Sequence, residues 1–254
     1  MRILVLIKQV PDTWGDRRLD PASGRIDRHE PEPVIDEIGE RAVEVALRYR
    51  DGSEAEVVVL TMGPESATDM LRRVLAMGVD RAIHVVDPAL EGADMMTTAT
   101  VLAAAIRHAG FDIVVAGNES SDGRGGVLPA MVAEHLGVHH LTGLDEVVID
   151  EESVRGVRVV GSERVTLRAA LPAIISVTER SPEARIAGFR GIMQAKKKPL
   201  ERFSLADISA ELPARRSIVT TVEQAPIRTA GTTIVDSGDA AVQLADFLTS
   251  QRLV

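Results

Sequence analysis

Residues 112–128 read DIVVAGNESSDGRGGVL, and this stretch decides the fold class. The run Asp112–Ala116 is apolar and rich in β-branched residues, which predicts a buried strand. A glycine-rich loop follows, and helical periodicity resumes over Leu128–Leu136. A strand that leads through a glycine-rich loop into a helix is typical of the carboxyl edge of an open parallel sheet, where ligands bind.

The same alternation of strands and helices extends over about 135 residues. The predicted strands are Met1–Val10, Glu56–Met62 and Arg81–Val86, and the predicted helices are Asp36–Arg50, Ser66–Met77 and Thr97–Ala109. This pattern predicts right-handed crossovers between parallel strands. We therefore predict the α/β class: a doubly wound, mostly parallel sheet in a three-layer α/β/α, Rossmann-like fold that binds an adenine nucleotide.

The second half of the chain is less regular. Three short segments predict an antiparallel extension: Glu146–Ile149, Val154–Val160 and Arg164–Leu171. Ala173–Val177 predicts another buried strand, Ser181–Pro199 is basic and irregular, and Ala240–Arg252 predicts an amphipathic helix. We predict an α/β domain over residues 1–212, and an arm with a terminal helix over 213–254. From the residues alone, that helix packs either on this chain or on a partner chain, and the resemblance described below favours the partner subunit.

Composition excludes several function classes. The net charge of −9 argues against nucleic-acid binding, and the absence of cysteine excludes disulfides, iron–sulfur clusters and thiolate zinc sites. The apolar run Ile3–Ile7 is too short for a signal peptide or a membrane span. We expect a cytoplasmic protein without membrane insertion.

The loop Gly117–Leu128 is the best candidate for a binding site. Its glycines would let the backbone approach a phosphate, and the N-terminus of the following helix offers unpaired N–H groups. Its polar side chains add further donors. The candidate residues are Gly117, Asn118, Glu119, Ser120, Ser121, Asp122, Gly123, Arg124, Gly125, Gly126, Val127 and Leu128. The loop is neither a dinucleotide fingerprint nor a Walker A loop, so a flexible loop with a helix cap is the alternative.

Other strand ends should meet this loop at the same edge of the sheet. They are Leu6, Met62 and the segment Pro33, Val34, Ile35 and Asp36 at the start of the first predicted helix. Together they would form an apolar floor for adenine. The alternative for each of them is ordinary core packing or helix capping.

The segment 180–202 is basic in an acidic chain, with seven basic and two acidic residues. Phe189 lies within it between glycines, and only four phenylalanines occur in the whole chain. An apolar anchor among positive charges is typical of a docking loop. The alternative is that Phe189 folds back onto its own domain.

We find no catalytic constellation. The six histidines lack metal-ligand spacing, and nothing resembles a nucleophile elbow or a metalloprotease helix. We therefore predict no metal site and no catalytic acid, base or nucleophile. A nucleotide site without such groups favours a binding protein, or one whose cofactor carries the chemistry.

Five stretches occur in an order that resembles the beta subunit of electron transfer flavoprotein, including its FixA-type relatives. They are ILVLIKQVPD (3–12), VIDEIGERAVEVAL (34–47), LRRVLAMGVDRAIHV (71–85), AGNESSDGRGG (116–126) and VTERSPEARIAGFRGIMQAKKKP (177–199). The resemblance implies an electron-carrier subunit that pairs with an alpha subunit and docks flavoprotein dehydrogenases. The alpha subunit would hold most of the FAD, and this chain would hold a structural AMP.

Carried onto this chain, the resemblance assigns the nucleotide contacts to Leu6, Pro33–Asp36, Met62 and Gly117–Leu128. It assigns docking to the loop 181–199, with Phe189 where the family typically has leucine. The docking residues would be Phe189, Arg190, Ile192, Met193, Lys196 and Lys197. Three alternatives stay open. The first is an electron-bifurcating subunit with a second FAD in place of AMP, and the second is a stand-alone nucleotide-binding protein resembling universal stress proteins. The third is a nucleotide-hydrolysing or adenylate-forming enzyme, which would share the fold layout.

Overall fold

The computed structural model describes residues 1–15, 17–28, 32–223, 225–226 and 231–254. The chain divides into two units, Met1–Thr221 and Val222–Val254, which are described separately. Residues 215–217 belong to the first unit: the Arg215 side chain donates to the Glu91 carbonyl, and the Arg216 and Ser217 amides donate to the Asp94 carboxylate. The division at residue 212 predicted from the sequence stays a prediction.

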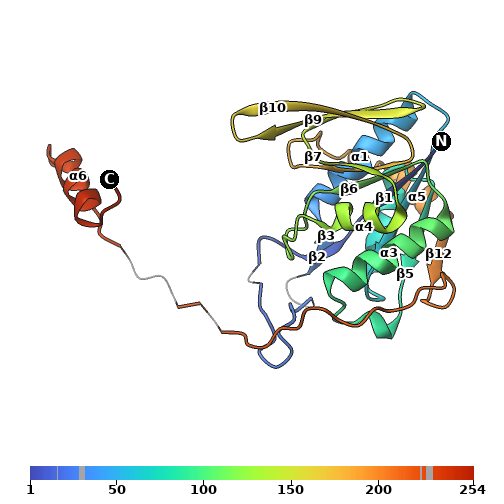
Figure 1. Cartoon of the computed structure of the whole chain (residues 1–254), viewed down its shortest axis with the longest axis horizontal. Helices are drawn as coiled ribbons and strands as arrows, with labels where there is room; N and C mark the ends of the chain where they lie inside the picture. Colours follow the sequence, from blue (N-terminus) through green and yellow to red (C-terminus); the bar gives the residue numbers. More distant parts are fainter. Residues whose placement is uncertain (16, 29–31, 224, 227–230) are drawn as a thin grey trace. The chain divides into compact units, whose positions relative to one another are not determined.

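A seven-stranded sheet forms the centre of the first unit (Figure 1). Its strands, in spatial order, are β12 (Leu200–Phe203), β5 (Arg81–Val85), β4 (Glu56–Met62), β1 (Arg2–Leu6), β6 (Ile113–Gly117), β11 (Ala173–Val177) and β7 (His139–Leu144). Every pairing in this sheet is parallel. The predicted fold class is confirmed.

Helices cover both faces of the sheet. α1 (Glu37–Asp51) and α2 (Ala67–Ala76) pack on the face that carries Ile3 and Val5. α3 (Met95–Ala109) and α4 (Leu128–Leu136) pack on the face that carries Leu4 and Leu6. Successive residues of a strand point to opposite faces, so a continuous apolar strand is buried on both sides. A short 3₁₀ helix, η1 (Pro88–Leu90), precedes α3.

Two smaller sheets extend this core. β8 (Glu146–Ile149), β9 (Ser153–Val160) and β10 (Glu163–Ala170) form the predicted antiparallel extension beside β7 (Figure 1). β2 (Gln9–Pro11) and β3 (Pro33–Ile35) form an antiparallel pair beyond the end of β1. The single strand predicted over Met1–Val10 is therefore wrong, because the chain leaves the sheet after Leu6 and pairs again from Gln9.

Five elements were not predicted: β3, η1, β7, β12 and the helix α5 (Phe189–Ala195). β7 begins with two exposed histidines, so it lacks the apolar run of the inner strands. α5 is short and exposes most of its residues, so its segment appears irregular in the sequence. β7 and β12 lie at the two edges of the sheet, where side chains are less buried, so the sequence shows a weaker apolar pattern.

The second unit contains α6 (Ala240–Ser250), which agrees with the predicted terminal helix. None of its residues is buried, and Val242, Leu244 and Phe247 are exposed. Within the described ranges, none of the helices combines the length and the apolar character that crossing a membrane requires.

Candidate functional site

The glycine-rich loop lies at the carboxyl edge of the central sheet. β6 pairs with β1 on one side and β11 on the other and ends at Gly117, and α4 begins at Leu128. The strand, loop and helix predicted over 112–136 are thus present in that order. Open parallel sheets bind ligands at the carboxyl ends of their strands, and this loop follows the carboxyl end of β6.

The last part of the loop presents free backbone donors. The N–H groups of Gly125, Gly126 and Val127 have no acceptor among the residues that the structure describes. Gly126 adopts φ 68°, and a side-chain carbon placed on it would meet no atom within 4 Å. The partial positive charge at the N-terminus of α4 adds to these donors. This part of the loop can accept an anionic group.

The first part of the loop is held by three basic side chains from the N-terminal segment. Lys8 Nζ lies 2.7 Å from Asp122 Oδ1 and donates to Ser120 Oγ at 3.2 Å. Arg28 Nη2 lies 2.8 Å from Asp122 Oδ2. Arg17 donates to the carbonyl and the hydroxyl of Ser121. The surface segment after β2 is therefore fastened to the loop.

Asp122 is the centre of this network. Its side chain is 2% exposed. Burial raises the pKa of its carboxyl, but the attraction and hydrogen bond of Lys8, the Ser120 hydroxyl and the charge of Arg28 together hold the pKa well below its usual range. Asp122 is therefore ionised at neutral pH, and its charge fixes the conformation of the loop.

Asp36 reaches the same loop from the start of α1. It is 2% exposed, and its Oδ2 and Oδ1 accept the Ser121 N–H at 3.1 and 3.3 Å. Burial raises the pKa of its carboxyl, and the Ser121 N–H opposes that shift. Among the side chains of Lys8, Arg17, Arg28, Asp36 and Asp122, three are basic and two are acidic, so basic groups outnumber acidic ones around residues 120–122.

The other predicted loop residues are placed as follows. Asn118 Oδ1 is buried and finds no hydrogen-bond partner in the described structure. Arg124 takes φ 49° and is exposed, and its guanidinium lies 3.3 Å from Glu119. Gly123 is also exposed, and its amide donates to Asp122. A buried amide oxygen without a donor is unusual in a folded protein, and it fits a ligand that brings an N–H or O–H group.

The strand-end residues lie close to the loop to different degrees. Leu6 ends β1 and pairs with Ala116 of β6, just before the loop. Asp36 contacts the loop, as described, and Gly117 packs against Ile38 of α1. Met62 ends β4, which is on the other side of β1 from β6. The structure thus brings Leu6, Asp36 and Gly117 together and places Met62 at a distance of two strands.

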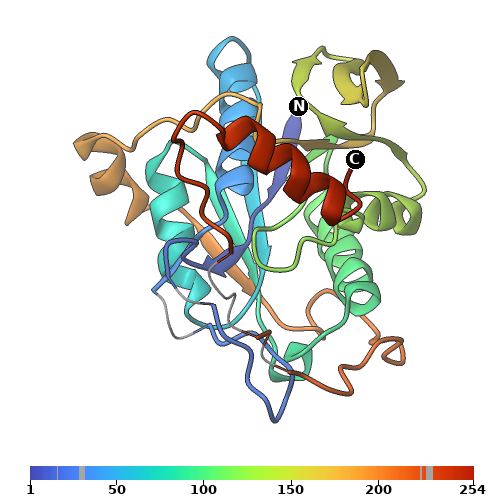
Figure 2. The same cartoon turned by 90° about the vertical axis from the view of Figure 1, so that its left-hand side faces the viewer.

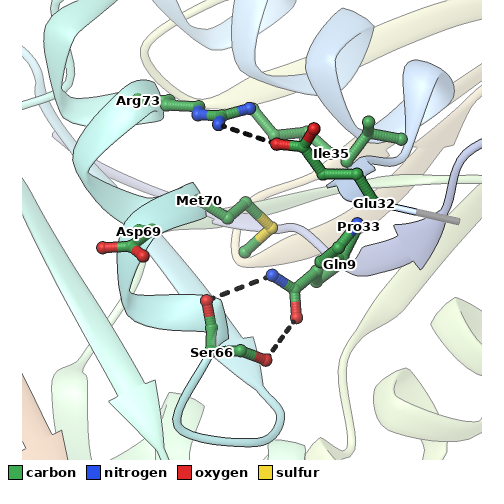
Figure 3. Close-up of a pocket in the computed structure, with 9 residues that line it drawn as sticks. Gln9, Glu32, Pro33, Ile35, Ser66, Asp69, Met70 and Arg73 are labelled. Atoms are coloured by element: carbon green, nitrogen blue, oxygen red, sulfur yellow. Dashed lines mark hydrogen bonds and ion pairs between the residues drawn. The ribbon is translucent and has the colours of Figure 1, made fainter. Parts of the chain in front are cut away.

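Pro33, Val34 and Ile35 line a different hollow, between β3 and α2 (Figure 3). Gln9 and Ser66 close one end of it by two hydrogen bonds, of 3.1 and 3.0 Å, and the Arg73–Glu32 ion pair spans the other at 3.7 Å. The Met70 side chain lies between them (Figure 3). The hollow has a volume of about 140 Å³, which is less than the roughly 300 Å³ at which pockets for cofactors begin. The nucleotide contacts predicted for Pro33, Val34 and Ile35 stay a prediction, and the Gly117–Leu128 loop is the candidate phosphate site.

The predicted docking segment forms an exposed apolar surface. Phe189 is 80% exposed, and Ile192 and Met193 of the same helix are exposed as well. Arg190, Lys196 and Lys197 are exposed beside them. Phe189 does not fold back onto its own domain. We call Phe189, Arg190, Ile192, Met193, Lys196 and Lys197 the docking surface.

Both ends of this segment are fixed to the domain, and α5 lies beside α2 (Figure 2). Arg185 forms ion pairs with Glu44 and Asp51 of α1, both at 2.8 Å. Lys198 Nζ donates to the Leu75 and Val79 carbonyls at 3.1 and 2.6 Å. Arg72 donates to the Ala195 and Lys198 carbonyls. Of the three consecutive lysines, Lys198 thus has a structural role, and the docking surface lies between two anchored ends.

Sequence reasoning missed Lys8, Arg17 and Arg28 as site residues. The available signal was weak: Lys8 interrupts an apolar strand, and the two arginines lie in a long polar segment of the kind that is usually functional. Their partners are 94 to 114 residues away along the chain, so spacing alone does not pair them.

Comparison with known proteins shows the family to which the chain is related. The model of the electron transfer flavoprotein domain matches residues 23–208. The chain is 43% identical to the electron transfer flavoprotein subunit beta of Mycobacterium tuberculosis, over 99% of each chain. It is 31% identical to the subunit of the same name from Clostridium acetobutylicum, over 83% of this chain and 81% of that one. It is 32% identical to a caffeyl-CoA reductase-Etf complex subunit of Acetobacterium woodii, over 82% and 80%.

Proposed function

Because this chain belongs to the electron transfer flavoprotein family, with beta subunits as its relatives, we propose that it is the beta subunit of a heterodimeric electron carrier. It would bind AMP as a structural ligand, pair with an alpha subunit and dock flavoprotein dehydrogenases. The observation that carries the proposal is the loop at the end of β6, with its free amides and basic surroundings. The chain would act by binding and positioning, without an acid, base or nucleophile of its own.

The residues of the loop fit a nucleotide phosphate. The free amides of Gly125–Val127 and the start of α4 would hold it, and the buried Asn118 Oδ1 would accept a hydrogen bond from the ligand. Leu6 and Asp36 border the same place. FAD, held mainly by the alpha subunit, would supply the redox chemistry. The contribution of this chain is to hold AMP, exclude water and support the partner that carries the flavin.

We assign the exposed face of α6 to the alpha subunit. Leu244 and Phe247, three residues apart, are exposed on one side of this helix, and an apolar helix face needs a surface to cover it. The polar segment before α6 is long enough to let the helix reach a second chain. The family relationship supports the alpha subunit as the occupant.

We assign the docking surface to flavoprotein dehydrogenases. Phe189 supplies an aromatic anchor, and Arg190, Lys196 and Lys197 supply positive charge in a chain whose net charge is −9. Aromatic anchors dominate the energy of many interfaces, and charges around them raise the encounter rate. The partner surface would be an apolar recess with an acidic rim.

The nucleotide content of the co-purified heterodimer tests the proposal. We expect one FAD and one AMP per heterodimer, released by denaturation and counted by chromatography and absorbance. Two FAD without AMP would replace this function by that of an electron-bifurcating subunit. A chain that purifies alone as a stable homodimer with a nucleotide would favour the stand-alone binding protein and contradict the proposal.

Replacing Gly191 with alanine should displace the docking surface. A side-chain carbon at Gly191 would lie 2.2 Å from the Ala76 carbonyl oxygen of α2, so α5 would have to move away. A displacement near 1 Å is enough to slow a reaction that depends on geometry, and we expect about a tenfold loss in kcat/KM for a dehydrogenase reducing the heterodimer. Gly188→Ala is the matched control, because a carbon there meets no atom within 4 Å. Equal rates in the two variants would show that the placement of α5 is unimportant for docking.

A further inference from the structure

The aspartates at the N-caps of α1, η1 and α3 use their side chains in two ways. Asp87 and Asp94 cap their own helices in the ordinary manner: their carboxylates accept the N–H groups of Ala89 and Thr97. Asp36 is the N-cap of α1, but its carboxylate makes no hydrogen bond to any described residue of that helix. A residue type that is favoured at this position for capping is therefore used for something else.

The carboxylate of Asp36 is committed to Ser121, 85 residues away along the chain. It accepts the Ser121 N–H at 3.1 and 3.3 Å and is 2% exposed. The Asp36 backbone is also fixed, because its N–H donates to the Lys8 carbonyl and its carbonyl accepts the Glu40 N–H. The backbone that carries this side chain is thus held by Lys8, two residues after the end of β1, and by the first turn of α1.

Ser121 is held from its other side by Arg17. The guanidinium donates to the carbonyl of Ser121 and, at 3.1 Å, to its hydroxyl. All three polar groups of Ser121 are therefore engaged by Asp36 and Arg17. The free amides of Gly125–Val127 follow four residues later in the same loop, so the Ser121 peptide is a fixed point from which the chain leads to them.

Holding one peptide group with a buried carboxylate costs free energy, because burial disfavours the charged form. Burial and the neighbouring Asp122 both raise the pKa of Asp36, while Lys8 and Arg17 lower it. An asparagine would keep an acceptor for the Ser121 N–H without the buried charge. It therefore supplies a conservative variant that separates the hydrogen bond from the ionisation.

We propose that Asp36 is a positioning residue of the nucleotide site, which acts by fixing the Ser121 peptide and does not touch the ligand. This inference rests on the proposed function. It replaces the direct nucleotide contact that the family resemblance assigns to Asp36. A direct contact would most naturally be to a ribose hydroxyl, as carboxylates make in related folds, whereas a positioning residue would affect all adenine nucleotides alike.

The test compares Asp36→Ala and Asp36→Asn in the full-length chain purified with its alpha subunit. Hydrogen exchange over residues 117–128 reports the Ser121 amide, and dissociation constants are measured for AMP, 2′-deoxy-AMP and 3′-deoxy-AMP. We expect Asp36→Ala to speed exchange of the Ser121 amide at least tenfold and to weaken all three nucleotides by the same factor, about tenfold. Asp36→Asn should restore exchange and binding to within about threefold of the wild type.

The outcomes separate the positioning role from the alternatives. Asp87→Ala, which removes an ordinary cap at η1, should leave loop exchange and AMP binding unchanged. Loss of affinity confined to nucleotides that carry a particular ribose hydroxyl would overturn the inference in favour of direct contact. Unchanged exchange at Ser121 in Asp36→Ala would also overturn it. A wild-type protein that binds none of the nucleotides would refute the proposed function, while the exchange measurement still decides the role of Asp36.

Discussion

Replacing Asp122 with asparagine should lower the free energy of unfolding at pH 7 by roughly 2–3 kcal/mol. The carboxylate is 2% exposed and pairs with Lys8 at 2.7 Å and Arg28 at 2.8 Å, so the variant removes the anion with which both cations pair. Breaking a buried pair costs about 3–5 kcal/mol, and we take a lower figure because Lys8 and Arg28 are themselves 41% and 34% exposed. Urea unfolding followed by circular dichroism measures the difference.

The pH dependence of this difference follows from the lowered pKa of Asp122. Its folded pKa lies below the unfolded value of about 3.9, so its stabilising contribution is fully present above that value. The contribution is lost as the pH falls from there through the folded pKa. The gap in unfolding free energy between wild type and Asp122→Asn should therefore be constant from pH 5 to 7 and narrow below about pH 4.

Glu146→Gln provides the matched control for Asp122→Asn. Glu146 pairs with Arg164 at 2.8 Å, but both side chains are 62% exposed, and exposed pairs contribute about 0–1 kcal/mol. A loss in Asp122→Asn no larger than in this control would mean that the Asp122 network does not stabilise the domain. A gap that persists unchanged to pH 3 would mean that the loss arises from packing and not from charge.

The inner sheet could be predicted from the sequence because burial on both faces leaves a strong pattern. The predicted bounds of Glu56–Met62, Leu128–Leu136 and Ala173–Val177 are those of β4, α4 and β11. The edge strands β7 and β12 lack that pattern, since an edge is only partly buried. The break after Leu6 was missed because the chain returns to strand pairing at Gln9, and hydrophobicity alone does not reveal a change of partner.

The candidate site could be predicted only in its local part. A strand, glycines and a helix are adjacent in sequence, so the loop 117–128 was identified from spacing. The network around Asp122 and Ser121 depends on Lys8, Arg17, Arg28 and Asp36, which reach it through the tertiary fold. Pairing distant charges requires knowing the strand order, in which β1 lies directly beside β6.

Replacing Phe189 with alanine should lower the rate of electron transfer from a partner dehydrogenase about 30-fold, if a buried aromatic anchor contributes about 2 kcal/mol to the docked complex. Phe189 is 80% exposed in this chain and contributes little to its own fold. The FAD and AMP content of the heterodimer and its thermal stability should therefore stay unchanged. Steady-state assays with the heterodimer as electron acceptor for the dehydrogenase give the rate.

Salt dependence separates the anchor from the charges around it. Loss of Phe189 removes apolar burial, so its effect should appear in the dissociation rate and be nearly independent of ionic strength. The double variant Lys196→Gln with Lys197→Gln removes exposed charges, so its effect should appear in the association rate and disappear at high salt. Phe189→Leu keeps an apolar anchor and should retain most of the rate. Loss of flavin in Phe189→Ala would mean that Phe189 has a structural role. Electron transfer as fast as in the wild type would mean that Phe189 has no role in docking. In either case dehydrogenases dock elsewhere.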